Sequence, residues 1–353
     1  MTTSSIQPLP ATFAVGSMTK PGGIDIVQVP TPKPGYGEAL VRIEATAICT
    51  WEQRSYSGAQ ENKFPFVGGH ESAGIVVALG PDYRGPLKEG DRVAVGGASC
   101  GACHWCLTNQ DRVCTRHYSG SVSYDCGWGP GGFAEYKIHP SDGLAFVGDI
   151  AADVASLTEP LSCAVHAARL ADVKVSSDVV VIGAGTMGLM NVLALKQRGA
   201  RVIVSEVDAG RLAMAKLMGA DICIDASAVD PVEAVKELTE GRGADTVVTA
   251  IGHKVANDQG LAMLAQRGTL VLFASAHPET PIEISPNKWH NNEKKILGVL
   301  SSEKEDFYIA ARLIRYGLVD VSPLIQGRYP LEKLSAALDQ SITPGCYRII
   351  VQP

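Results

Sequence analysis

Four cysteines stand close together in the first half of the chain, at Cys100, Cys103, Cys106 and Cys114. Four thiolates can surround one tetrahedral Zn²⁺ ion, and structural zinc sites are closed and rich in cysteine. The alternatives are unmetallated surface cysteines or two disulfides. A chain with nine cysteines and no export signal favours metal binding, because thiols stay reduced in the cytoplasm. The spacing predicts a structural zinc ion that replaces the core of a loop-rich lobe.

Sulfur, imidazole and carboxylate also occur in a dispersed set, at Cys49, His70, Glu71 and Glu159. Taken singly, each residue is unremarkable. A lone cysteine after an apolar strand is more often buried filler, and a lone glutamate is usually solvated. Together they offer the mixed ligands that a catalytic zinc ion with an open coordination position uses.

A dinucleotide-binding pattern covers Asp178–Glu206. The β-branched run Val179–Ile182 predicts a strand buried on both faces, and it leads directly into Gly183-Ala184-Gly185-Thr186-Met187-Gly188 and an apolar helix. The first glycine makes a tight turn, the second lets a pyrophosphate approach, and the third lets the helix pack on the strand. A lone GxGxxG often marks a plain turn. Here the second strand and its acidic end, Glu206, complete the unit.

Glu206 predicts a preference for NAD over NADP, because a carboxylate at this place accepts hydrogen bonds from the ribose hydroxyls and repels a 2′-phosphate. Arg211 could partly offset that repulsion. The expected cofactor-binding set consists of Gly183, Gly185, Thr186, Met187, Gly188, Glu206, Arg211, Ala274 and Ser275.

The chain resembles the zinc-containing medium-chain alcohol dehydrogenases, in the style of the sorbitol and threonine dehydrogenase branch. The resemblance covers almost the entire chain, and the order and spacing of its motifs are specific. The residues that carry it are Cys49, Gly69-His70-Glu71-Ser72-Ala73-Gly74, Lys88-Glu89-Gly90-Asp91-Arg92-Val93, the four-cysteine lobe, Gly132-Phe133-Ala134-Glu135-Tyr136, Glu159-Pro160-Leu161, Gly183–Gly188 and Arg328-Tyr329-Pro330-Leu331.

The resemblance implies an α/β protein with a doubly wound parallel (Rossmann) sheet and a β-rich GroES-like catalytic domain. The catalytic domain is expected at 1–158 and 300–353, and the NAD-binding domain at 159–299. By the same resemblance Cys49 and His70 bind a catalytic zinc ion, and either Glu71 or Glu159 is the third ligand. Two zinc ions per chain and NAD would then serve the oxidation of a secondary alcohol, such as a polyol, to its ketone. A homodimer or homotetramer is expected.

The run from Cys49 to Arg54 departs from the family pattern. Trp51 replaces a hydroxyl and Arg54 an imidazole that pass the alcohol proton to solvent, while Glu52 keeps a carboxylate that can orient His70. Trp51 could be a core aromatic and Arg54 a surface charge. If both line the substrate cleft, they favour a polyhydroxy or acidic substrate, with the proton leaving through water near Glu71 or Glu159.

Two rival functions follow from the missing relay. The scaffold could reduce a polarised C=C or C=N bond with NAD(P)H, or it could be a non-catalytic NAD-binding module. Retention of Cys49, His70, Glu71 and Glu159 argues against the module, because an idle site does not need these four residues.

The elements around these residues fall into two groups. Up to Gly97, short strands are separated by glycine and proline, and Ala39–Ala45 alternates apolar and polar residues, which predicts a half-exposed antiparallel sheet. A glycine-dense turn at 127–132, a strand at 133–139 and a helix at 153–171 follow. From Ser177, strands at 179–182, 201–204, 222–224, 246–249, 269–273 and 295–299 alternate with helices at 187–197, 209–218, 231–238 and 257–264. Helices at 304–316 and 331–340 and a strand at 347–351 return to the first group.

The composition limits the partners. The chain has 353 residues, 46% of them apolar, and a net charge of −6, so nucleic acid and anionic membranes would repel it. Met1–Pro10 is polar, and no apolar run reaches the roughly 20 residues that span a bilayer. We expect a cytoplasmic enzyme whose partner is a small-molecule substrate.

Overall fold

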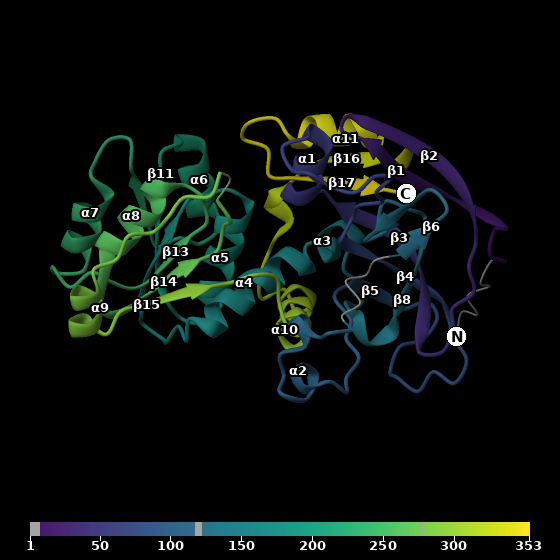
Figure 1. The fold of residues 1–353 in the computed structure, drawn as a ribbon, viewed down its shortest axis with the longest axis horizontal. Helices are drawn as coiled ribbons and strands as arrows, with labels where there is room; N and C mark the ends of the chain where they lie inside the picture. Colours follow the sequence, from purple (N-terminus) through teal and green to yellow (C-terminus); the bar gives the residue numbers. More distant parts are fainter. Residues whose placement is uncertain (1–7, 117–121, 277) are drawn as a thin grey trace. The chain divides into compact units, whose positions relative to one another are not determined.

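A computed structural model describes residues 8–116, 122–276 and 278–353, so most of the polar segment 1–10 lies outside the described residues. The chain forms two compact units (Figure 1). Unit 1 comprises the described part of Met1–Ser162 together with Ser302–Pro353, and unit 2 is Cys163–Ser301. Unit 1 thus ends four residues later at its first boundary, and resumes two residues later at its second, than the expected bounds 1–158 and 300–353. Ser162 and Ser302 are tied by a hydrogen bond of 2.7 Å between their hydroxyl oxygens.

Unit 1 is built on a seven-stranded sheet in the order β16-β17-β3-β4-β5-β9, with β8 also paired to β3. The central strands pair antiparallel, as the alternation in Ala39–Ala45 predicts. The last strand of the chain, β17, lies beside β3, which comes from the N-terminal part of the chain (Figure 1). The strands are β1 (Thr12–Lys20), β2 (Gly23–Pro30), β3 (Glu38–Ala47), β4 (Glu71–Leu79), β5 (Arg92–Val95), β6 (Val122–Tyr124), β7 (Gly127–Gly129), β8 (Tyr136–Pro140), β9 (Leu144–Phe146), β16 (Ile325–Pro330) and β17 (Arg348–Gln352).

Unit 1 also contains helices. They are α1 (Thr50–Ser57), α2 (His104–Leu107), α3 (Ala152–Ser156), α10 (Lys304–Arg315) and α11 (Leu334–Ser341), while α4 (Thr158–Leu170) begins in unit 1. The sequence did not indicate α1, because its residues show no apolar stripe. It ends at Gly58, whose φ of +76° is the left-handed cap that glycine adopts readily. The single helix expected at 153–171 is broken at Leu157, whose N–H donates to Val154 across a tighter turn.

Unit 2 contains a parallel sheet of six strands in the order β12-β11-β10-β13-β14-β15. Every residue of β10 is buried, as the run Val179–Ile182 predicts. Its strands are β10 (Asp178–Ile182), β11 (Arg201–Glu206), β12 (Ile222–Asp225), β13 (Ala244–Thr249), β14 (Leu264–Leu272) and β15 (Lys295–Gly298). Its helices are α5 (Thr186–Gln197), α6 (Ala209–Leu217), α7 (Pro231–Leu238), α8 (Lys254–Met263) and α9 (Pro286–Asn292). The doubly wound fold is confirmed.

Among the described residues, no helix has both the length and the apolar character needed to span a membrane.

Candidate functional site

The loop that carries His70 is held in place by glycine contacts. Gly69 has a φ of +94°, and a Cβ there would lie 2.7 Å from the backbone nitrogen of Phe133. A Cβ on Gly132 would lie 2.0 Å from the carbonyl oxygen of Gly69, so both positions need glycine for the two segments to approach. The Gly132 N–H donates to the Gly68 carbonyl at 2.9 Å. This contact fixes the path of the chain into β4, and with it the position of His70.

Glu52 orients the His70 ring, as expected. Its Oε1 lies 2.9 Å from His70 Nδ1 and accepts a bond of 2.9 Å from the Gly69 N–H. With Nδ1 taken, Nε2 is the ring nitrogen that can bind a metal ion. Burial by itself would lower the pKa of His70, but Glu52 and the Cys49 sulfur raise that pKa well above its ordinary value. Metal binding at this histidine is therefore coupled to proton release.

Cys49, His70 and Glu71 come together in unit 1. Cys49 precedes α1, and the possible ligand atoms of the three side chains lie within 4.8 Å of one another. Burial raises the pKa of the Cys49 thiol, and the nearby Glu71 adds to the shift. A sulfur, an imidazole and a carboxylate at this spacing fit a single zinc ion.

Glu71 is also committed to a buried ion pair. Arg348 on β17 is 2% exposed, and it donates from Nε and Nη2 to the two carboxylate oxygens of Glu71 at 2.9 and 2.7 Å. Burial lowers the pKa of Arg348, but Glu71 overcomes this effect, so the guanidinium stays charged. Arg348 was not among the residues expected from the sequence. Its one signal was a basic residue inside an apolar strand, which needs a buried partner.

Glu159 reaches the same group from α4. Its Oε2 lies 4.0 Å from His70 Nε2, and its side chain keeps 19% of its surface exposed. The structure thus brings all four residues of the dispersed set together. Of the two glutamates, Glu71 has both oxygens bonded to arginine, and Glu159 faces the nitrogen of His70 that is not bonded to Glu52.

Trp51 and Arg54 both lie on α1. The indole ring of Trp51 is centred 5.7 Å from the imidazole ring of His70, so it stands directly beside the candidate metal ligand. Arg54 is half-buried. Within the part of the chain that the structure describes, its guanidinium forms no ion pair.

The four cysteines of the lobe converge on one point. Four of the six pairs of sulfur atoms lie 3.5–3.9 Å apart, and all six lie within 4.8 Å. Four sulfurs at about 2.3 Å from a zinc ion would lie about 3.8 Å apart in a regular tetrahedron. The four thiols form no disulfide. The Cys106 backbone N–H lowers the pKa of Cys103 to about 6, which favours the thiolate that binds metal. The donor set and its spacing fit a closed zinc site.

The lobe is anchored on the start of α10. The backbone N–H of Arg112 donates to the carboxylate of Glu303 at 2.7 Å, and the Lys304 N–H donates to Asp111 at 3.1 Å. The lobe has little core of its own, because no residue of α2 is buried.

The glycine-rich turn in unit 2 has the expected shape. Gly183 has a φ of +97°, and a Cβ on Gly188 would lie 1.9 Å from the Gly183 carbonyl oxygen, so α5 packs closely on β10. A Cβ on Gly185 would meet nothing within 4 Å, which leaves room for a ligand at the start of α5. Thr186 and Met187 form the first turn of this helix. Its free N–H groups suit a pyrophosphate.

Glu206 lies beside this turn at the end of β11. Its carboxylate accepts bonds from the backbone N–H groups of Ala184, Val207 and Asp208 at 2.8, 2.7 and 3.1 Å. Arg211 Nη1 lies 4.0 Å from it. The three hydrogen bonds from backbone N–H groups hold the negative charge of Glu206 in place, a feature that the sequence did not reveal.

Ala274 and Ser275 follow β14 and lie against the neighbouring loop. The Ala274 N–H donates to Thr249 at 3.1 Å, and a Cβ on Gly252 would lie 2.0 Å from the Ser275 carbonyl oxygen. Since β10, β13 and β14 are adjacent and parallel, these residues and the glycine-rich turn share the carboxyl edge of the sheet.

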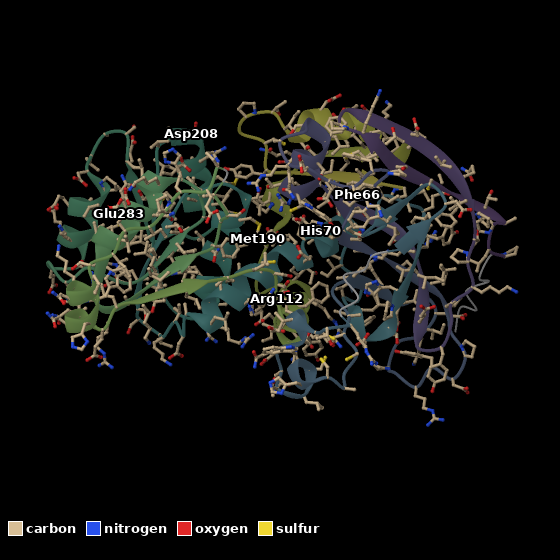
Figure 2. The ribbon with its side chains drawn as sticks, in the orientation of Figure 1. Phe66, His70, Arg112, Met190, Asp208 and Glu283 are labelled. Carbon is tan, nitrogen blue, oxygen red and sulfur yellow. The ribbon has the colours of Figure 1, made fainter. Side chains whose placement is uncertain are left out.

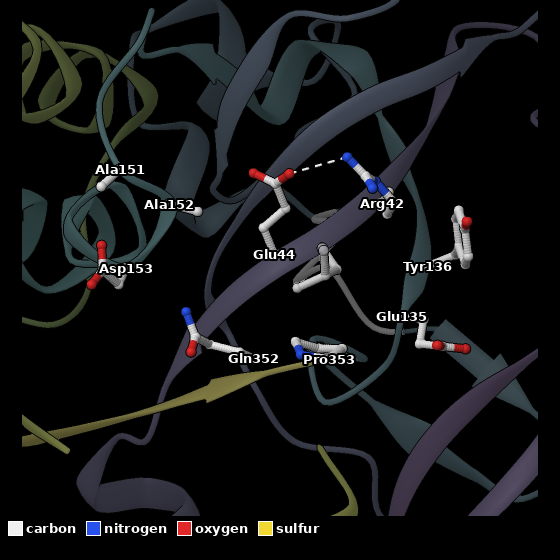
Figure 3. A pocket seen from close by; sticks show the side chains of 10 residues that line it. Arg42, Glu44, Glu135, Tyr136, Ala151, Ala152, Asp153, Gln352 and Pro353 are labelled. Atoms are coloured by element: carbon white, nitrogen blue, oxygen red, sulfur yellow. Dashed lines mark hydrogen bonds and ion pairs between the residues drawn. The ribbon is translucent and has the colours of Figure 1, made fainter. Parts of the chain in front are cut away.

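A pocket of about 620 Å³ in unit 1 has none of these residues in its lining (Figure 3). Its charged groups already have partners. Arg42 pairs with Glu44 at 3.1 Å, Glu135 accepts from the Ala14 N–H at 2.6 Å, and Asp153 pairs with Arg328. This pocket shows no chemistry of its own.

Known proteins resemble the chain over nearly its whole length. A family described as zinc-binding dehydrogenase matches residues 186–315, and one described as alcohol dehydrogenase GroES-like domain matches residues 35–149. An L-threonine 3-dehydrogenase of Bacillus subtilis is 33% identical over 94% of this chain and 95% of its own length. A zinc-binding dehydrogenase from Sinorhizobium meliloti, solved with NADP, has a TM-score of 0.87 and 26% identity, covering 98% of this chain and 100% of its own. An alcohol dehydrogenase from Escherichia coli, solved with NADH, has a TM-score of 0.85 and 25% identity over 98% of this chain and 100% of its own.

Proposed function

Because this chain belongs to the zinc-containing medium-chain alcohol dehydrogenase family, in its threonine and sorbitol dehydrogenase-like branch, we propose that it interconverts a hydrophilic secondary alcohol and its ketone with NAD(H). The observation that carries the proposal is the grouping of Cys49, His70 and Glu71 within 4.8 Å, with Glu159 facing His70. When bound, zinc supplies the Lewis acid that polarises the substrate oxygen, and the nicotinamide accepts the hydride.

Glu159 is our candidate for the third zinc ligand. Both oxygens of Glu71 are engaged by Arg348, whereas the Glu159 Oε2 is 4.0 Å from His70 Nε2. Glu71 would then sustain the site by keeping Arg348 in place, and Glu52 would keep the His70 ring turned so that Nε2 faces the ion.

The substrate class follows from the two residues that replace the family's proton relay. An indole face beside His70 suits the C–H side of a polyol or hydroxy acid, and the Arg54 fork suits a carboxylate or a pair of hydroxyls. L-threonine, the compound in the names of several relatives, is a secondary alcohol that also carries a carboxylate. We therefore rank hydroxy acids and polyols above simple alkyl alcohols.

NAD is proposed as the preferred cofactor, although the two structural neighbours are solved with NADP and NADH respectively. The Glu206 carboxylate is held by three backbone N–H groups, so it cannot turn away easily from a 2′-phosphate. We expect kcat/KM for NAD to exceed that for NADP, and Glu206→Gln to narrow the gap. Equal values for both cofactors in the unmodified enzyme would refute the assignment.

Two zinc ions per chain are proposed, one in the lobe and one at Cys49 and His70. Metal analysis of fully reduced protein should give two zinc ions, and a chelator should abolish activity before it unfolds the chain. One ion or none would contradict this proposal. A homodimer or homotetramer is also proposed, and light scattering would measure it.

The decisive experiment is zinc-dependent NADH formation with a panel of L-threonine, D-sorbitol, xylitol, other hydroxy acids and alkyl alcohols. We expect at least one hydroxy acid or polyol to outperform every alkyl alcohol. The loss of the family's relay residues at Trp51 and Arg54 keeps a second candidate, the reduction of a polarised C=C or C=N bond with NAD(P)H. NADH consumption with enones or imines, and none with ketones, would favour that second function.

A further inference from the structure

Three aromatic side chains follow one another in unit 1, beginning beside His70. The Trp51 ring is centred 5.7 Å from His70 and packs edge to face on Phe66, with centroids 5.0 Å apart. Phe66 packs in the same manner on Trp128, with centroids 5.6 Å apart. Figure 2 labels His70 and Phe66. The series connects the candidate metal ligand with a residue of β7 that lies far away in the sequence.

Phe66 is held firmly between its neighbours. Its side chain is fully buried, and its backbone exchanges two hydrogen bonds of 2.8 Å with Met18. A Cβ on Gly129 would lie 2.8 Å from the Phe66 ring, so the glycine makes room for the ring against β7. Trp128 is therefore one of the contacts that fix the place of the Phe66 ring.

Trp128 is anchored at its far end. Its indole N–H donates to the Lys63 carbonyl at 2.8 Å, and its carbonyl accepts a bond of 2.8 Å from the Val67 N–H. The chain on both sides of Phe66 is thus bonded to Trp128. Trp128 therefore packs on the Phe66 ring and also holds, through these hydrogen bonds, the segment that leads to His70.

Trp51 depends on these contacts more than the other rings do. It is only partly buried, and in the part of the chain that the structure describes its indole N–H has no hydrogen-bond acceptor. Its orientation therefore rests on ring packing against Phe66 and His70. If Phe66 loosened, the indole could turn about its side-chain bonds and change the space beside His70.

We propose that Trp128 is a specificity-determining positioning residue, which acts through Phe66 to hold the Trp51 indole beside His70 and so sets the width of the substrate space. The proposal rests on the proposed function, because it assumes that substrate binds at His70. In this series Trp128 packs on Phe66, two rings away from the one beside His70. Its effect should appear in substrate binding, not in the chemical step or in zinc retention.

The test uses the zinc-loaded enzyme with Trp105 and Trp289 changed to Phe. The chain has four tryptophans, so Trp128→Phe and Trp128→Leu in this background each leave Trp51 as the sole indole. Trp128→Phe keeps a ring against Phe66, and Trp128→Leu removes it. We expect lower fluorescence anisotropy of Trp51 in the Leu variant than in the Phe variant, with unchanged zinc content.

Kinetics supply the second readout, with whichever of L-threonine, D-sorbitol and xylitol the enzyme oxidises. Trp128→Leu should raise KM for that substrate about tenfold relative to Trp128→Phe, with kcat and the KM for NAD within about twofold. Equal anisotropy in the two variants would overturn the proposal, and so would a change in KM without a change in anisotropy. If no hydroxy acid or polyol of the full panel is oxidised, the proposed function fails separately, and the anisotropy still decides whether Trp128 holds Trp51.

Discussion

The lobe gathers its four sulfurs from residues 100–114, whereas the second group draws on separate elements: Cys49 before α1, His70 before β4, and Glu159 on α4. The lobe has little apolar core, since no residue of α2 is buried. In the second group, the scaffold already holds the side chains through Glu52 and Arg348. A local metal site with little core around it can serve folding, and a dispersed one can serve chemistry, because hydrogen bonds from the surrounding scaffold position its side chains.

The largest expected effect separates the two sites directly. We expect His70→Ala to lower kcat/KM by about 10³ or more, because the Lewis acid contributes several kcal/mol to the transition state. Its unfolding temperature should also fall, because the change leaves the buried Glu52 without its imidazole partner, but by less than that of Cys103→Ser. Cys103→Ser should lower the unfolding temperature while the folded fraction stays active. Thermal denaturation and steady-state kinetics on both variants check this.

A result in which both variants lose stability equally, or both lose activity equally, would break the comparison. Zinc content adds a control, because each variant should lose one ion and retain the other.

The second effect concerns the glutamates beside His70. Glu71→Gln should destabilise the chain by about 3–5 kcal/mol, because it leaves the buried Arg348 without a full counter-charge. Glu159→Gln, at a partly exposed side chain, should change the free energy of unfolding by less than about 1 kcal/mol but should release zinc faster. Urea denaturation and zinc-release kinetics measure both. If Glu71→Gln alone speeds zinc release, Glu71 is the third ligand and our choice is wrong.

More of the lobe than of the dispersed group could be predicted from the sequence. Cys100, Cys103, Cys106 and Cys114 are close in sequence, so their convergence needs no knowledge of the fold. The turn Gly183–Gly188 was equally local, and the structure bears out the close packing at Gly188. The Glu52–His70 bond was also foreseen, because it follows from a known family motif.

The rest depends on contacts between distant parts of the chain. Arg348 meets Glu71 only because β17 joins the sheet next to β3, which no local pattern announces. The helix α1 was missed because tertiary packing, and not an apolar stripe, stabilises it. For the same reason the sequence left open whether Glu71 or Glu159 is the third zinc ligand, because no local pattern distinguishes the two glutamates.

A third effect concerns the pH dependence of stability that comes from the scaffold and not from the metal ligands. Lys137 on β8 is 2% exposed, and burial lowers its pKa to about 7. Between pH 7 and 10.5 the unfolded chain holds the lysine proton and the folded chain does not, so stability rises with pH there. The slope should be about 1.4 kcal/mol per pH unit.

Lys137→Met should remove this slope and raise stability near pH 7. Urea denaturation of both proteins at three pH values between 7.5 and 9.5 checks it, with zinc present throughout. An identical pH dependence in the two proteins would show that the pKa of Lys137 is not lowered. Other groups, such as the metal ligands, would then cause the pH dependence of the free energy of unfolding.

The smallest expected effect asks how far the chemistry of the dispersed group extends along α1. Arg54→Lys keeps the positive charge but removes the planar fork that can bond two oxygens at once. We expect kcat/KM for the true substrate to fall about fivefold to tenfold, mainly through KM, while the KM for NAD is unchanged. Arg84→Lys, at an exposed position, is the matched control. If Arg54→Lys behaves like that control, Arg54 is only a surface charge, and Trp51 is the last residue of α1 that belongs to the substrate site. If Arg54→Lys loses activity and the control does not, Arg54 binds the substrate. The dispersed group then differs from the closed lobe in substrate binding as well as in metal binding.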